Sequence, residues 1–469
     1  MNGQSDTDLL IIGGGSAAFA AAIKAAELGA RVIIAEKGLI GGTCVNIGCV
    51  PSKTLIRAAE ICYRCAYHEF QGLTACPPPS DWRRVVAQKD ELVAALREGK
   101  YVQVAEAYPT ISIVRGEARL EADTAVSING AVYRPRGILV ATGSHPWTPP
   151  IPGLAEAGYL DSTDALSLPA LPESMIVIGG GAIGLELGQL LARFGVRVTL
   201  LEAGDRIAPA EEPDVSAAMT DALRRETLQI ETGVHVARVE RNQGGYRVLA
   251  EVAGEARTFV AEQLLFTTGR RPTTEGFGLE AAGVELGVHG EILVNEHLQT
   301  RNPAIYAAGD VLGEPMFVYV AAYAGAFAAE NALTGVGRVY DLSVLPRVTF
   351  TDPQIASVGL TEQAAAEQGL AIKTAMIHLK DVPRAVVARN TRGLIKLVAE
   401  ERTGRLLGAH VLAPEAGDVV QEATLAIRYG LAIRDLIDTF HPYLTMAEGL
   451  KLAALAFDRD VKKLSCCAT

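Results

Sequence analysis

An internal repeat limits the fold of this chain more strongly than any other feature. The segment DLLIIGGGSAAFAAAIKAAELGARVIIAEK begins at Asp8, and a similar segment, SMIVIGGGAIGLELGQLLARFGVRVTLLEA, begins at Ser174. Each reads as an apolar strand, a glycine turn, a long amphipathic helix and a second apolar strand with a glutamate at its end. This order is that of a βαβ unit. The sequence therefore predicts an α/β fold with two Rossmann-like domains.

The glycine turns of both repeats match the pattern that binds dinucleotides. Small residues allow a tight turn and a close approach of the backbone to a pyrophosphate at the helix N-terminus. Near the end of each second strand, Glu36 and Glu202 are expected to accept hydrogen bonds from the adenosine ribose. The small residues are Gly13, Gly15 and Ala18 in the first copy, and Gly179, Gly181 and Gly184 in the second.

At 469 residues the chain is too long for one core, and its motifs indicate three domains. Two strands run into Thr-Gly turns, Thr142-Gly143 and Thr268-Gly269, where we expect the chain to return to a nucleotide-binding sheet. A later strand ends at Asp310, which is placed to hold a ligand hydroxyl or to cap the apolar helix expected from Phe317. The predicted limits are 1–150 and 271–340 for the first nucleotide-binding domain, 151–270 for the second, and 341–469 for an α+β domain.

The α+β domain lacks a glycine fingerprint. Its predicted strands and helices alternate. We expect strands at 347–352, 385–390, 393–400 and 405–413, and helices from Pro414 and from Thr445.

Charge and hydropathy exclude several kinds of partner. The net charge is −11 and no block of basic residues occurs, which argues against nucleic acid. No apolar run reaches the roughly 20 residues of a membrane span, and the N-terminus lacks the basic segment of a secretory signal. We therefore expect a cytoplasmic protein with no membrane partner.

Close pairs of cysteines in a reducing compartment indicate redox chemistry or metal handling. Cys44 and Cys49 are separated by four residues, and Pro51 suits an early position of the helix that follows. The dipole of that helix would lower the pKa of a nearby thiol. This pair, directly after a dinucleotide-binding unit, is the predicted chemical centre.

Two further pairs are less clear. Cys62 and Cys65 share one face of the same helix and could hold a soft metal, although ordinary helix packing is the favoured interpretation. Cys466 and Cys467 are adjacent near the C-terminus, where a disulfide between them would be strained, so both thiols stay available.

The motifs together resemble the pyridine nucleotide-disulfide oxidoreductases over essentially the whole chain. The resemblance rests on GGTCVNIGCVPSK, in which Gly42 and Thr43 are expected to bind cofactor, on both glycine fingerprints, and on the turns at Gly143, Gly269 and Asp310. It implies FAD on the first βαβ unit and NAD(P)H on the second. It also implies a homodimer formed through the third domain, with an active site shared between subunits.

The resemblance also assigns roles to single residues. Cys49 would lie against the flavin, and Cys44 would be the outer, exchanging sulfur. Lys53 would pair with Glu186 beside the flavin, and Asp310 would hold its ribityl chain.

Within this family, the C-terminal sequence resembles the mercuric reductases. Disulfide reductases carry the motif H-P-T-x-S-E, whereas HPYLTMAEGLK keeps His441 but has Tyr443 and Met446 in place of the threonine and glutamate. A histidine without its carboxylate is a poorer acid–base catalyst, so reduction of small disulfides is not favoured.

The resemblance instead implies reduction of Hg(II)-thiol complexes to Hg(0). Cys466 and Cys467 would capture this soft metal and pass it to Cys44 and Cys49, and Tyr443 would line the inner site. Many mercuric reductases carry an N-terminal metal-binding domain, which we expect to be absent because the first strand follows closely on Met1.

Two alternatives stay open. A thioredoxin reductase-like enzyme could use the C-terminal cysteines as a redox relay, and a metal-binding or redox-sensing flavoprotein could carry the same motifs with negligible turnover.

The choice between NADH and NADPH is also open. Glu202 should repel a 2′-phosphate and favours NADH, whereas the nearby Arg206 and the family favour NADPH; we expect NADH.

Overall fold

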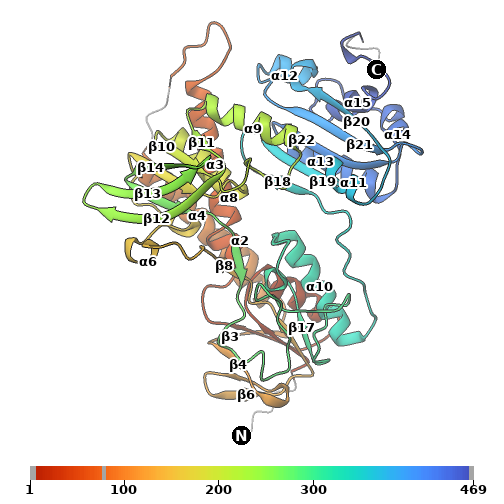
Figure 1. Ribbon diagram of the computed structural model, residues 1–469. Helices are drawn as coiled ribbons and strands as arrows, with labels where there is room; N and C mark the ends of the chain where they lie inside the picture. The colour runs from red at the N-terminus through yellow and green to blue at the C-terminus, as the bar shows by residue number, and fades with distance from the viewer. Residues whose placement is uncertain (1–6, 77–80, 464–469) are drawn as a thin grey trace. The chain divides into compact units, whose positions relative to one another are not determined.

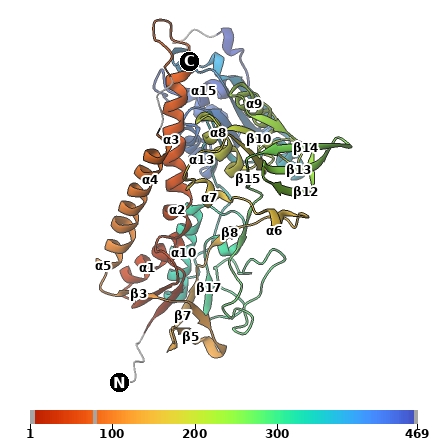
Figure 2. The same ribbon diagram turned by 90° about the vertical axis from the view of Figure 1, so that its left-hand side faces the viewer.

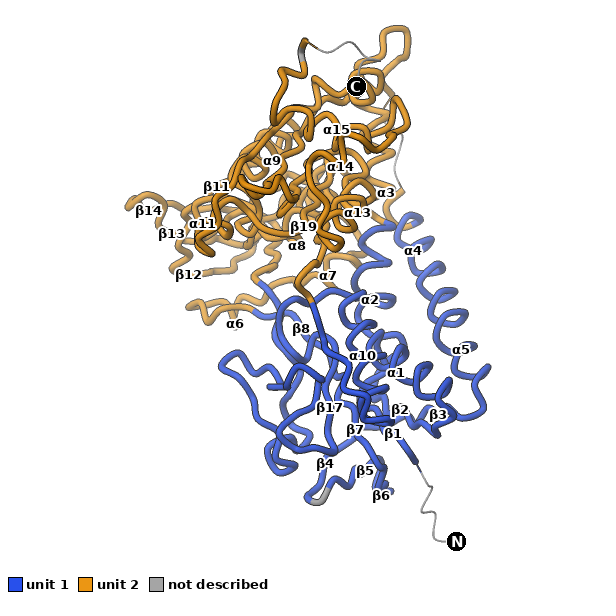
Figure 3. Tube along the Cα trace, turned by 90° about the vertical axis from the view of Figure 1, so that its right-hand side faces the viewer, with its two compact units in different colours: residues 1–54, 84–147, 269–341 blue, residues 55–83, 148–268, 342–469 orange. Residues whose placement is uncertain are grey.

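The computed structural model describes residues 7–76 and 81–463, and its contacts divide the chain into two compact units (Figure 3). Unit 1 contains residues 1–54, 84–147 and 269–341, and unit 2 contains residues 55–83, 148–268 and 342–469. Residues 55–83, expected in the first nucleotide-binding domain, thus belong to unit 2. The second and third predicted domains both lie in unit 2, so their separation stays a prediction.

Unit 1 is built on a parallel five-stranded sheet in the order β17-β7-β1-β2-β3. Both faces of its central strands are buried, which explains their continuous apolar sequences. The strands are β1 (Leu9–Ile12), β2 (Val32–Glu36), β3 (Ile111–Arg115), β7 (Gly137–Val140) and β17 (Ile305–Ala307).

Two helices and a small sheet cover the faces of this sheet. Leu9 and Ile11 pack with α1 (Ser16–Glu27) and α10 (Val318–Thr334), which lie side by side (Figure 2). Leu10 and Ile12 point to the opposite face and pack with an antiparallel sheet. That sheet contains β4 (Ala118–Leu120), β5 (Val126–Ile128) and β6 (Ala131–Tyr133).

The other elements of unit 1 are shorter or flank the sheet. The helices α2 (Gly42–Asn46), α4 (Trp82–Arg97) and α5 (Gln103–Glu106) follow the first βαβ unit along the chain. A two-stranded ribbon pairs β8 (Ser144–Pro146) with β16 (Arg270–Pro272). The long α3 (Cys49–Ala66) begins at a predicted redox cysteine.

The second repeat forms a parallel sheet in unit 2, in the order β11-β10-β9-β15, with α8 (Ala182–Arg193) after its glycine turn. Leu9 pairs with Val32 in unit 1 and Ser174 with Arg197 here, so the partners are 23 residues apart in both repeats. The predicted βαβ units are therefore confirmed, and their two strand pairs share the same register. The strands are β9 (Ser174–Ile178), β10 (Arg197–Leu201), β11 (Gln229–Glu231) and β15 (Gln263–Phe266).

An antiparallel sheet and several helices complete this part of unit 2. The sheet has the order β12-β13-β14 and packs on the parallel one through residues such as Tyr246 and Leu264. The elements are β12 (Val234–Asn242), β13 (Gly245–Val252), β14 (Glu255–Ala261), α6 (Leu154–Ala157), α7 (Ser162–Ala165) and α9 (Pro213–Arg225).

The C-terminal part of unit 2 is a five-stranded antiparallel sheet with helices packed against it (Figure 1). Its strand order is β18-β19-β22-β21-β20. The elements are β18 (Arg347–Thr349), β19 (Gln354–Gly359), β20 (Ile372–His378), β21 (Leu394–Glu400), β22 (Leu406–Ala413), α11 (Glu362–Glu367), α12 (Pro383–Val387), α13 (Ala416–Arg428), α14 (Ile433–Asp438) and α15 (Glu448–Leu455).

One predicted strand of this part is wrong. Residues 385–390 were expected as a strand, but they continue the short helix α12 and the turn after it. Pro383 stands in the first turn of that helix, where its fixed φ and missing N–H are tolerated, and Ala385 is buried. The strand preference of two adjacent valines is weaker than this local tendency to begin a helix at Pro383.

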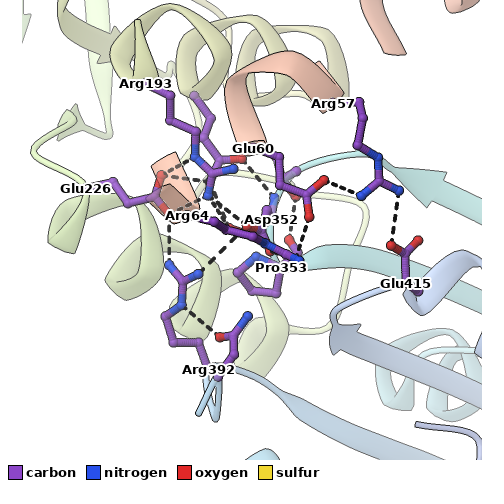
Figure 4. Close-up of polar contacts among 12 residues, drawn as sticks. Arg57, Glu60, Arg64, Arg193, Glu226, Asp352, Pro353, Arg392 and Glu415 are labelled. Carbon is purple, nitrogen blue, oxygen red and sulfur yellow. Dashed lines mark hydrogen bonds and ion pairs between the residues drawn. The ribbon is translucent and has the colours of Figure 1, made fainter. Parts of the chain in front are cut away.

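Buried charged side chains hold the second half of α3 in unit 2 (Figure 4). Arg193 Nε lies 2.7 Å from Glu226 Oε2, and Arg193 Nη2 lies 3.0 Å from Asp352 Oδ2. Arg392 Nη1 lies 2.8 Å from Glu226 Oε1. The ring of Tyr63, from α3, lies 4.3 Å from the Arg193 guanidinium. These contacts fix the rotation of α3 about its axis.

Loss of Arg193 is expected to lower the free energy of unfolding strongly, because its ion pair with Glu226 is buried. The two side chains are 3% and 1% exposed. Arg193→Ala removes one of the two guanidinium groups that pair with the buried Glu226 and leaves only Arg392, which should cost roughly 3 kcal/mol of unfolding free energy. Urea denaturation of the purified protein measures this loss.

The matched control is Arg434→Ala. Arg434 Nε lies 2.7 Å from Asp438 Oδ2, but these side chains are 72% and 57% exposed. Its removal should cost much less than the loss of Arg193, because water screens an exposed ion pair. Equal losses for the two variants would show that burial does not determine the contribution of the Arg193 pair.

Candidate active site and nucleotide-binding sites

Cys44 and Cys49 lie together in unit 1, as predicted from their spacing. Cys44 is within α2 and Cys49 begins α3, and both thiols are partly buried. A hydrogen bond with Cys49, together with burial, raises the pKa of Cys44 well above that of an ordinary thiol, while the charge of Lys53 acts in the opposite direction. The pair is a close dithiol beside a cation.

Two residues that the sequence analysis missed hold this dithiol in place. Asn46 Nδ2 donates to the carbonyl oxygens of Ile40 and Gly42, each at 2.9 Å, and Arg97 Nη1 donates to Asn46 Oδ1 at 2.9 Å. These bonds stabilise the short helix α2, which five residues alone would not maintain. Asn and Arg carry no motif, so only the fold brings them here.

Tyr101 is a third missed residue. Its hydroxyl lies 3.5 Å from Ser16 Oγ, at the start of α1. Burial raises the pKa of Tyr101, and the negative charges of Cys44 and Cys49 add to this effect. Tyr101 is therefore a neutral phenol close to the dithiol.

The first glycine turn forms a cradle that fits the pyrophosphate of FAD. Gly13 has φ of 106°, and a Cβ there would lie 2.3 Å from the carbonyl oxygen of Ala141. Gly15 is the N-cap of α1 and has no side chain with which to accept from the first N–H groups of the helix. A helix N-terminus of this kind binds phosphate.

The second turn repeats this geometry and fits a nicotinamide dinucleotide. Gly179 has φ of 112°, and a Cβ there would lie 2.7 Å from the carbonyl oxygen of Thr267. A Cβ at Gly184 would lie 1.9 Å from the carbonyl oxygen of Gly179. Gly181 caps α8, again without a side-chain hydrogen bond. The first copy tolerates Ala18 at the position of Gly184.

The two strand-end glutamates make the same contacts in both repeats. Glu36 accepts hydrogen bonds from the N–H groups of Gly14 and Gly38, each at 2.6 Å. Glu202 accepts them from Gly180 and Gly204, each at 2.6 Å. An ionised carboxylate has about four acceptor positions, so each glutamate can also accept from a ribose. Their contact with ribose stays a prediction.

Asp310 and the Thr-Gly turn meet at the carboxyl ends of neighbouring strands. Ser144 Oγ donates to Asp310 Oδ2 at 2.8 Å, and Arg270 Nε donates to Ser144 Oγ at 2.8 Å. Thr142 Oγ1 donates to the carbonyl oxygen of Thr273 at 2.6 Å. Gly143 has φ of 71° and turns the chain into β8. This arrangement fits a residue that holds FAD hydroxyls, with Ser144 and Arg270 as supports that the sequence did not reveal.

The structure shows where the other predicted site residues lie, but their functional roles stay predictions. Gly42 begins α2, followed by Thr43, and Gly269 has φ of 119°. Glu186 is buried in α8, where its Oε1 accepts from the N–H of Phe350 at 2.8 Å. Lys53 belongs to unit 1 and Glu186 to unit 2, so their pairing stays a prediction.

The C-terminal motif needs one correction. His441 has a carboxylate partner: its Nε2 lies 2.7 Å from Oε1 of Glu422, which α13 supplies. The expectation of an unpaired histidine is therefore wrong. The family motif places the carboxylate after the histidine, whereas Glu422 stands 19 residues before His441. Cys466 and Cys467 lie outside the described residues.

The two neighbouring motif positions are also described. Glu448 is buried, and its Oε2 accepts from the N–H of Leu444 at 3.3 Å. Glu448 thus stabilises the start of α15. Tyr443 is half exposed.

We expect the His441–Glu422 pair to make stability depend on pH. The hydrogen bond with Glu422 raises the pKa of His441. A raised folded pKa stabilises the fold fully below the unfolded pKa of about 6.5, and the contribution is lost as pH rises through the folded value. Glu422→Gln should therefore lower the urea midpoint more at pH 6 than at pH 9. Asp418→Asn, on the exposed side of α13, is the control; equal losses for Glu422→Gln at both pH values would contradict the assignment.

Comparison with known proteins agrees with this geometry. The profile of the pyridine nucleotide-disulphide oxidoreductases matches residues 7–325, and that of their dimerisation domain matches residues 345–454. Among solved structures, the HOCl-induced flavoprotein disulfide reductase RclA from Escherichia coli superposes with a TM-score of 0.85 at 30% identity, over 96% of this chain and 99% of that one.

Curated relatives are similar over nearly the whole chain. A mercuric reductase of Staphylococcus aureus is 49% identical over 467 residues, which cover 100% of this chain and 85% of the relative. A mercuric reductase of Streptomyces lividans is 48% identical over 469 residues, which cover 98% of each. The chain therefore belongs to the pyridine nucleotide-disulphide oxidoreductase family, an assignment that implies FAD and NAD(P)H as its cofactors.

Proposed function

We propose that the protein is a mercuric reductase, which reduces thiol-bound Hg(II) to Hg(0) with electrons from NAD(P)H. The observation that carries the proposal is the close dithiol Cys44–Cys49 in a chain that is 43–49% identical to seven mercuric reductases. Hg(II) is a soft cation that prefers thiolates, so two adjacent sulfur atoms suit it as ligands.

The dithiol and its surroundings would perform the chemistry as follows. Hg(II) arrives bound to two small thiols, and Cys44 and Cys49 replace them by exchange, each protein thiol giving its proton to a departing thiolate. Lys53 favours the thiolate forms during this exchange. FAD, which the first glycine turn, Glu36 and Asp310 would hold, would supply the two electrons, received from NAD(P)H, that convert Hg(II) to Hg(0). Both sulfur atoms remain as thiolates, so no disulfide leaving group needs a proton.

Capture of the metal by Cys466 and Cys467 is proposed from their sequence, because they lie outside the described residues. In this proposal the C-terminal pair takes Hg(II) from small thiols and passes it to the inner dithiol. Tyr443 would line the inner site.

We also propose a homodimer with a shared active site. The dimerisation profile covers residues 345–454, and this segment exposes large apolar side chains around His441. Phe440 is 98% exposed and Tyr443 is 49% exposed. Apolar surface of this kind marks an interface. The partner's copy of this segment would then complete each site.

A disulfide reductase is the second candidate. The observation that favours it is the His441–Glu422 pair, because a carboxylate that raises the pKa of His441 helps it to hold the proton that a leaving thiolate needs. RclA, the similar solved structure, is a disulfide reductase by its description.

Substitution of Cys44 or Cys49 tests whether the inner dithiol takes part in the reduction of Hg(II). Cys44→Ala or Cys49→Ala should reduce Hg(II)-stimulated NAD(P)H oxidation to the background rate, since a single thiolate cannot hold the metal for electron transfer. The assay measures NAD(P)H consumption and volatile Hg(0) with excess small thiol present. Cys76→Ala, which removes an exposed thiol elsewhere, is the control.

Three further results would bear on the mechanism. Retained turnover in either inner variant would remove that cysteine from the reaction. Stimulation by a protein disulfide but not by Hg(II) would support the second candidate. Replacement of Cys466 and Cys467 by alanine should slow turnover most when Hg(II) is bound to bulky or excess thiols, and an unchanged rate would refute the relay.

We propose NADH as the preferred donor. Glu202 is negative and held at the end of β10, where it would repel a 2′-phosphate, and Arg206 is already engaged with Asp205 and with the carbonyl oxygen of Pro209 at 2.9 Å. Glu202→Gln keeps an acceptor but removes the charge. It should lower the ratio of kcat/KM for NADH over NADPH roughly tenfold, or about 1.4 kcal/mol. A wild-type enzyme that strongly prefers NADPH would refute the assignment.

A further inference from the structure

Cys62 and Cys65 form a second thiol pair that the reaction does not use. They are three residues apart in α3, so their Cβ atoms are about 5–6 Å apart on neighbouring turns of the helix. Cys65 is exposed and Cys62 is partly buried. Burial raises the pKa of Cys62, and the nearby Cys65 raises it further. The two sulfur atoms are thus near each other and within reach of solvent.

The charged network of unit 2 holds the opposite side of the helix. At 3.6 residues per turn, Cys62 and Cys65 lie within about 60° of each other around α3. Arg57, Glu60 and Arg64 lie on the other side of α3 by the same rule and make the contacts drawn in Figure 4. Arg57 also reaches Glu415, at 3.2 Å. Because these contacts fix the rotation of the helix, they also fix the direction in which the thiols point.

The ligand set of this pair restricts the metals it can bind. Among the described residues, no three or more His, Cys, Asp or Glu side chains are arranged to hold a metal ion. A site here therefore offers two sulfur ligands. Zn(II) prefers four ligands in a tetrahedron. Hg(II), in contrast, is stable with two thiolates in a line, as in the small-thiol complexes that deliver it.

We propose that Cys62 and Cys65 bind one soft, two-coordinate thiophilic cation of the Hg(II) class, at a site separate from the inner dithiol. The metal enters by exchange: two Hg–S bonds to small thiols break, two to Cys62 and Cys65 form, and each protein thiol gives its proton to a departing thiolate. No electrons are transferred. The choice of Hg(II) as the cation rests on the proposed function, but binding at this site does not require turnover.

Cys76 offers an internal comparison. Its N–H donates to the carbonyl oxygen of Cys65 at 3.0 Å, so its backbone lies beside this turn of the helix. Cys76 is exposed. The proposal nevertheless assigns the metal to Cys62 and Cys65, whose positions on a helix held by the charged network are fixed. Cys76→Ser is therefore the matched control.

The test uses the full-length, FAD-loaded protein in which Cys44, Cys49, Cys466 and Cys467 are replaced by alanine. The reduced protein is incubated with one equivalent of HgCl2 and an excess of small thiol, desalted in the same thiol so that only a chelate of two cysteines retains the metal, and assayed for Hg and flavin. We expect about one Hg(II) per protomer, falling below about 0.1 in the Cys62→Ser and Cys65→Ser derivatives and unchanged in Cys76→Ser. Zn(II) in a parallel incubation should be lost on the column.

Several results would overturn the proposal. One is retention of Hg(II) in the Cys62→Ser derivative with loss in Cys76→Ser, which would assign the metal to Cys65 and Cys76. Another is equal retention of Zn(II), or a Cys62–Cys65 disulfide that survives the reductant. Flavin content and circular dichroism identify any derivative that fails to fold, and such a derivative is replaced by its alanine counterpart. Because the assay measures bound metal, failure of the intact enzyme to release Hg(0) would refute the proposed function and leave this result unaffected.

Discussion

The close approach of backbone to backbone at the end of the first strand of each repeat is the constraint on which the rest of the structure depends. At Gly13 and at Gly179, the turn into the helix passes so near a carbonyl oxygen of a neighbouring strand that no side chain fits between them. This contact aims the helix N-terminus at the place where a pyrophosphate would lie. In unit 1 the dithiol comes after the second strand of the same repeat, since α2 and α3 follow β2 along the chain. The chemistry is therefore positioned by the sheet and not by the loops alone.

Much of the fold could be predicted because its main elements carry local patterns. Both βαβ units, the apolar strands and the helix after Asp310 follow from periodicity and glycine spacing, which each segment displays by itself. The error at 385–390 has a local cause as well: adjacent valines favour a strand, but the proline at position 383 starts a helical turn. In such short segments one or two residues determine the secondary structure. Average strand and helix propensities do not show which of these residues dominates.

The site was predictable only where its chemistry lies in a motif. The spacing of Cys44 and Cys49 in the sequence identifies them as a pair. The side chains that hold them, Asn46 and Arg97, are 51 residues apart and share no motif. Glu422 was missed for a similar reason, because it reaches His441, which lies between α14 and α15, from the separate helix α13. A family motif records which residue a known member uses, whereas a carboxylate can approach the same imidazole from any neighbouring element. Such substitutions become visible only when the three-dimensional arrangement is known.

The contacts of Glu202 have a consequence for how cofactor preference can change. The carboxylate that would meet the ribose also accepts two backbone N–H groups of its own repeat, from Gly180 in the phosphate turn and from Gly204 beyond the strand. Glu36 does the same in the first repeat. A drift from NADH to NADPH by loss of this glutamate would therefore loosen the turn that holds the phosphates. Selection for the other nucleotide would act against selection for a stable fold, and would be easier through new cations around the glutamate than through its replacement.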